Sequence, residues 1–93
     1  MAQRLVVSRK TRMKTCTLVL EYNYAKKAGL GTVWIFNGDG LRELDRPEPM
    51  QELQGWTRVA GPLPYETAAS IHAALKDFLT KSGVAVLDKG IAD

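Results

Sequence analysis

The sequence predicts an α+β fold: a mainly antiparallel sheet of about five to six short strands, with one long C-terminal helix packed on one face. Three observations carry this prediction: an alternating apolar pattern over residues 15–24, a helical apolar period over residues 64–81, and turn-forming Gly, Asn and Pro between short apolar runs. The 93-residue chain, 45% hydrophobic, has room for one core, because a separate core needs on the order of 50 residues. We therefore expect a single domain over residues 1–93.

The first two strands are expected on either side of a charged turn. Residues 4–8 contain a short apolar run and predict a strand. Residues 15–24 alternate, so that Cys16, Leu18 and Leu20 share one face of a second strand. We expect the two strands to form a hairpin whose tip is the basic segment between them.

Three further strands are expected before the helix. Residues 32–36 are β-branched and aromatic and predict a third strand. The Asn-Gly-Asp-Gly run at 37–40 predicts a chain reversal, after which residues 41–44 are expected to return as a fourth strand. Residues 45–52 contain two prolines and are expected to form a loop, with one helical turn over residues 49–53 as an alternative. Residues 56–60 predict a fifth strand.

The helix prediction depends on its boundaries and on one apolar stripe. Pro64 suits the first helical position, and Glu66 complements the positive end of the helix dipole. The stripe that we expect to face the core consists of Ala68, Ile71, Leu75, Phe78 and Leu79. His72 is expected on the solvent side. Gly83 ends the helix, and residues 84–87 predict a last strand.

Part of the C-terminal half resembles a known domain. A Val-Ala-Gly-Pro run at 59–62 precedes the helix and a Gly-Val-Ala-Val run at 83–86 follows it, an order that resembles the second half of the peptidoglycan-binding SPOR domain. A SPOR domain has two such units, and no matching helix pattern precedes Trp56. We therefore interpret the resemblance as shared local geometry and assign no family.

One functional hypothesis comes from the uneven charge. The net charge is +3, but residues 1–27 carry seven basic and one acidic side chain, whereas residues 28–93 carry six basic and nine acidic ones. Flexible cations at a hairpin tip can contact a phosphate backbone, and the alternative is a solvated turn. The candidate nucleic-acid-binding residues are Arg9, Lys10, Arg12 and Lys14.

The other hypothesis is a small non-enzymatic binding or regulatory module that acts through protein–protein contacts. The two prolines of residues 45–50 limit the conformational entropy lost on binding. Arg46, Met50 and Trp56 are the candidate contact residues, and the alternative is a plain connector. The sequence does not identify the partner protein. A homodimer is a further alternative, because so small a chain leaves sheet surface to cover.

Motifs for chemistry are lacking in the sequence. Cys16 and His72 are the single residues of their types and share no local signature. No Cys, His, Asp or Glu group has metal-ligand spacing, so we predict no catalytic residue, no cofactor and no metal. No apolar run reaches the roughly 18 residues of a membrane span, and no signal peptide is recognisable. We expect a cytoplasmic protein that does not bind a membrane.

Overall fold

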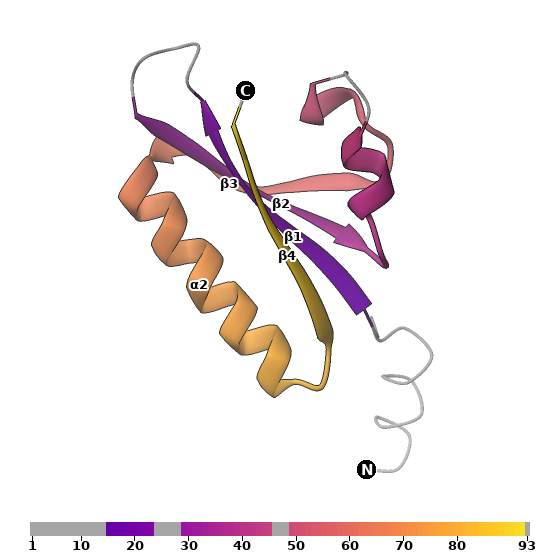
Figure 1. The fold of residues 1–93 in the computed structure, drawn as a ribbon. Coiled ribbons are helices and arrows are strands. Elements are labelled where there is room, and N and C mark those ends of the chain that lie inside the picture. Colours follow the sequence, from indigo (N-terminus) through magenta and orange to yellow (C-terminus); the bar gives the residue numbers. More distant parts are fainter. Residues whose placement is uncertain (1–14, 24–28, 46–48, 93) are drawn as a thin grey trace.

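The computed structural model describes residues 15–23, 29–45 and 49–92. They form an α+β fold, in which η denotes a short 3₁₀ helix. The elements in chain order are β1 (Thr15–Asn23), β2 (Leu30–Asn37), η1 (Leu41–Asp45), η2 (Met50–Glu52), β3 (Trp56–Pro64), α2 (Tyr65–Lys81) and β4 (Ala85–Ala92). Figure 1 shows α2 on one face of the sheet, which we name the helix face, and η1 and η2 toward the opposite face.

The sheet is mixed and its strand order is β3-β2-β1-β4. The pairings of β1 with β2 and of β2 with β3 are antiparallel, whereas β4 runs parallel to β1. The parallel pairing arises because α2 carries the chain from the end of β3 back along the sheet, as a crossover helix does between parallel strands. The described residues contribute four strands, fewer than the five or six expected.

The expected hairpin at the start of the chain includes residues that the structure does not describe. Residues 4–8 lie outside the described residues, but their expected partner strand is fully occupied. β1 is paired with β2 along one edge and with β4 along the other, from its first residue to Tyr22. A strand has only two edges, and β2 and β4 take both edges of β1.

Residues 41–44 were expected to form a strand but belong to η1, so this prediction was wrong. The Thr17 hydroxyl holds the preceding turn by accepting the Gly40 N–H at 2.8 Å and donating to the Gly38 carbonyl at 2.9 Å. The Asp39 carboxylate then accepts the Leu41 N–H at 3.1 Å, a local bond that favours a turn. Both edges of β2 are already paired, so no edge remains there for a returning strand.

Apolar side chains pack on both faces of the sheet. On the helix face, Leu18 and Val33 are fully buried, and Ala68 of α2 is buried with them. The close approach of α2 requires Gly31 on β2, because a Cβ atom there would lie 2.9 Å from the Ala68 Cβ. The opposite face holds a core cluster that consists of Val19, Trp34, Met50, Leu53 and Trp56.

The helix has the expected boundaries but not the expected orientation. Ala68 is buried, and Ile71, Leu75 and Leu79 are half-buried, as the stripe predicted. Phe78, which we placed in the core, is 65% exposed. The His72 side chain, which we placed in solvent, is only 13% exposed, because it follows Ala68 by four residues and so lies on the same helix side.

Candidate functional site

Strand β4 forms an edge of the sheet and is regular along its whole length. Its eight residues pair with β1 in one continuous register, from Ala85 opposite Thr15 to Ala92 opposite Tyr22. Among the described residues, no strand pairs with the outer side of β4. A regular edge strand presents a row of backbone N–H and C=O groups that another strand can bond.

The opposite edge, formed by β3, is poorly suited to accept a strand. Pro62 and Pro64 have no N–H to donate. The pairing of β3 with β2 also shifts register twice, between Gly31 and Val33 and between Val33 and Trp34. Prolines and irregular pairing are two ways in which proteins block pairing at a sheet edge. The two edges therefore differ, and only β4 is regular.

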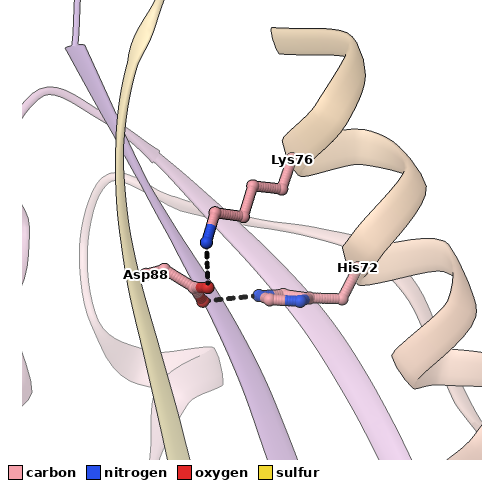
Figure 2. Close-up of polar contacts among 3 residues, drawn as sticks. All are labelled: His72, Lys76 and Asp88. Carbon is pink, nitrogen blue, oxygen red and sulfur yellow. Dashed lines mark hydrogen bonds and ion pairs between the residues drawn. The ribbon is translucent and has the colours of Figure 1, made fainter. Parts of the chain in front are cut away.

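Two side chains of α2 hold β4 from the helix face, as Figure 2 shows. Lys76 Nζ donates to Asp88 Oδ2 at 3.0 Å, and His72 Nε2 lies 2.7 Å from Asp88 Oδ1. The His72 contact does not meet hydrogen-bond geometry, so we treat it as electrostatic. Because His72 and Lys76 are one helical turn apart, both reach the same carboxylate near the middle of β4.

These contacts favour the ionised form of Asp88. Burial disfavours the carboxylate, but the hydrogen bond and charge of Lys76 and the contact with His72 outweigh burial, so the pKa of Asp88 is lowered. The folded pKa therefore lies below the unfolded one. Such a group stabilises the fold above its unfolded pKa and loses this contribution as the pH falls through its folded pKa.

Replacing Asp88 with asparagine is expected to lower the free energy of unfolding at pH 7 by less than about 1 kcal/mol, because water screens a partly exposed ion pair. The Asp88 and Lys76 side chains are 31% and 47% exposed. Urea unfolding measured from pH 7 down to about pH 2 checks this, since the gap between wild type and variant should narrow as the pH falls below the unfolded pKa and through the lower folded pKa of Asp88.

Asp77→Asn is the matched control, because Asp77 and Lys81 form an exposed i,i+4 pair at 3.1 Å on α2. It should change the free energy of unfolding at pH 7 by a few tenths of a kcal/mol at most. A gap between wild type and Asp88→Asn that stays constant over the whole pH range would contradict the prediction.

A cavity of about 550 Å³ lies at the end of β4, beside Ala92. Tyr22 of β1 and Tyr65 at the start of α2 line it, and their rings meet edge to face with centroids 5.0 Å apart. The Tyr65 N–H donates to the Gly29 carbonyl at 2.7 Å and fixes the first turn of the helix. This volume lies within the range of ligand pockets in proteins.

A smaller hollow, of about 280 Å³, lies on the opposite face of the sheet. There the Trp34 indole Nε1 donates to Glu21 Oε1 at 2.9 Å, and Glu21 is 8% exposed. Met50 of the core cluster also lines the hollow. Asn23 lines the same hollow, and its buried Oδ1 has no hydrogen-bond partner, so the polar groups of this hollow are only partly satisfied.

None of the predicted contact residues that the structure describes lies on the surface. Met50 and Trp56 are 5% and 9% exposed and belong to the core cluster, so their side chains are not exposed anchors. The other predicted contact residues lie outside the described residues and are Arg9, Lys10, Arg12, Lys14 and Arg46. Nucleic-acid binding therefore stays a prediction. The described residues carry five basic and eight acidic side chains, so the net positive charge of the chain comes from the other residues.

Cys16 has the environment of a structural residue. It is fully buried on β1, and burial raises the pKa of its thiol, which keeps the reactive thiolate form scarce. Within residues 15–23, 29–45 and 49–92, no group of three or more His, Cys, Asp or Glu side chains could hold a metal ion. No helix in this part of the chain is both long and apolar enough to cross a membrane.

The sequence interpretation missed the β4 edge and the contacts of Asp88. One local signal was present: Asp88 and Lys89 interrupt the otherwise apolar residues of the last strand, and charged residues, lysine above all, are typical of an edge strand. No family model matches this chain, and neither a curated protein nor a solved structure matches it significantly.

Proposed function

We propose that this chain is a small protein-binding module that takes up an extended segment of a partner protein as an additional strand along β4. The observation that supports this proposal is the regular, outward-facing edge of β4. In binding by strand addition, backbone hydrogen bonds supply affinity and the alternating side chains supply specificity. An edge of eight residues is longer than the usual strand of five or six.

Strand β4 is also held in place before a partner arrives. Its inner side is paired with β1, a central strand, and Asp88 ties its middle to α2 through His72 and Lys76. An edge that is already extended loses little conformational entropy when a partner binds. This preorganisation supports β4 as the binding strand.

Amide hydrogen exchange tests the proposal directly. Binders are first selected from a displayed library of random extended peptides, and backbone exchange is then measured by NMR with and without a saturating synthetic peptide. We expect protection to rise about tenfold or more at alternate residues of β4, because only every second amide of an edge strand points outward. The amides of β3 serve as the internal control and should not change.

Peptide N-methylation provides a second readout. A methyl group on a backbone nitrogen removes the donor, and an added strand uses donors only at alternate positions. Methylation of one alternate set should abolish binding, whereas methylation of the other set should leave it nearly unchanged. Failure to select any binder, or new protection at β3 in place of β4, would contradict the proposal.

A further inference from the structure

We propose that the strand added to β4 carries a large aromatic or apolar side chain that fills the cavity beside Ala92, and an acidic side chain beside Lys89, three residues away. This inference rests on the proposed function, because both side chains are positioned by strand addition. It specifies the chemistry of the partner: an extended peptide with an aromatic and an acidic residue at a fixed spacing.

The oblique path of α2 explains why the cavity borders β4. Ala68, near the start of the helix, meets Gly31 on β2, whereas His72 and Lys76 reach Asp88 on β4. The helix therefore begins over the inner strands and approaches β4 only farther along. The helix-face side of Ala92 therefore borders the cavity. Tyr22, the register partner of Ala92 on β1, lines the same cavity.

The residues at this end of β4 that lie on the helix face have small side chains. Alternate residues of a strand share a face, and Asp88 lies on the helix face, so Gly90 and Ala92 lie there too. Neither side chain is large enough to fill the space next to Tyr22 and Tyr65. A partner residue beside Ala92 on the same face would bring its side chain to these two rings, and aromatic side chains pack favourably against such an edge-to-face pair.

Lys89 supplies the second specificity element. It lies on the opposite face of β4, between Leu87 and Ile91, and it is exposed. Within the described part of the chain, Lys89 has no ion pair, whereas Asp88 next to it is neutralised by α2. A carboxylate on the neighbouring residue of an added strand would pair with this cation, and a lysine there would be repelled.

The alternation of a strand then fixes the spacing of the partner's two residues. Ala92 and Lys89 are three positions apart and lie on opposite faces of β4. An added strand has the same period, so its aromatic and acidic residues must also be three positions apart. Their order along the peptide depends on whether the strand adds parallel or antiparallel to β4, and the experiment includes both orders.

The test uses synthetic ten-residue peptides with a Thr/Val/Ser background, titrated against the full chain by fluorescence anisotropy. Two peptides carry Phe-x-x-Glu or Glu-x-x-Phe, and two others have the glutamate moved by one position. We expect one of the first two to bind about tenfold more tightly than its shifted version, because the shift moves the glutamate to the wrong face.

Two protein variants assign the effects to their residues. Lys89→Glu should weaken binding of the glutamate peptide about fivefold or more. It should strengthen binding of the same peptide with lysine in place of glutamate. Lys81→Glu is its control, since this exposed cation on α2 gives the same change of net charge. Ala92→Leu should block the phenylalanine peptide, whereas Ala85→Leu at the far end of β4 should not.

The outcomes separate this inference from the proposed function. One outcome would overturn the inference and leave strand addition intact: peptides protect the β4 amides, but their affinity depends on none of the residue spacing, the Lys89→Glu exchange and Ala92→Leu. If no peptide protects β4, both are overturned. The inference and the proposed function are both supported if Lys89→Glu binds the lysine peptide more tightly than wild type does and Ala92→Leu no longer binds the phenylalanine peptide.

Discussion

Replacing Leu18 with alanine is expected to lower the free energy of unfolding by about 3–4 kcal/mol, a typical cost for a fully buried leucine. Leu18 is fully buried on the helix face of β1. Its neighbours in register are Ile35 on β2 and Asp88 on β4. Because β1 is paired on both edges, its backbone cannot shift to close the space that the leucine leaves. The loss is a large share of the roughly 5–14 kcal/mol expected for a chain of this length.

Phe78→Ala is the matched control for Leu18→Ala, and urea unfolding followed by circular dichroism measures both. Phe78 is the larger side chain, but it is 65% exposed. Its removal should therefore cost less than about 1 kcal/mol, because little apolar area returns to water. Equal losses for the two variants would show that α2 is rotated from the orientation described above, with Phe78 in the core.

The elements that the sequence predicted well are those whose signals are local. The alternation of residues 15–24 marks β1, and the β-branched run at 32–36 marks β2. Pro64 and Gly83 bound the helix, because proline favours the first turn and glycine accepts the conformation that ends it. Each of these signals depends on only a few neighbouring residues, so it is independent of the contacts that the rest of the chain makes.

The orientation of α2 could not be predicted in this way. The apolar stripe is wider than the part of the helix surface that the sheet covers. Periodicity alone therefore does not show which margin of the stripe, that is, which of its two sides, is exposed. Phe78 lies at the exposed margin and His72 at the buried one. A histidine can take the buried margin because Asp88 pairs with it there, and Asp88 follows His72 by sixteen positions along the chain.

The candidate site depends on which strand lies at an edge, and that is a property of the whole sheet. The residues of β4 would have the same local pattern in the centre of a sheet as at its border. Only the pairing of β1 with both β2 and β4 places β4 outside. The cavity beside Ala92 similarly depends on where the first turn of α2 lies over the sheet. Neither feature leaves a local sequence signal, apart from the adjacent charges of Asp88 and Lys89.

Replacing Gly61 with alanine is expected to lower the free energy of unfolding by about 3 kcal/mol, through backbone strain and a steric clash together. Gly61 has a φ of 115°, which side-chain-bearing residues rarely adopt. A Cβ atom there would lie 2.7 Å from the Gly31 carbonyl oxygen and 2.8 Å from the Thr32 Cα. Both are backbone atoms of β2, which is paired on its other edge with β1, so neither can move aside cheaply.

Gly83→Ala separates the two contributions to the Gly61→Ala loss. Gly83 also has a positive φ, 89°, but a Cβ atom there would meet nothing within 4 Å. This variant should lose only the strain contribution, about 1 kcal/mol. Urea unfolding of both variants alongside wild type provides the measurement. If the two variants lose the same amount, then β3 does not approach β2 at Gly61 as closely as described, and the register shift that closes this edge of the sheet is absent in solution.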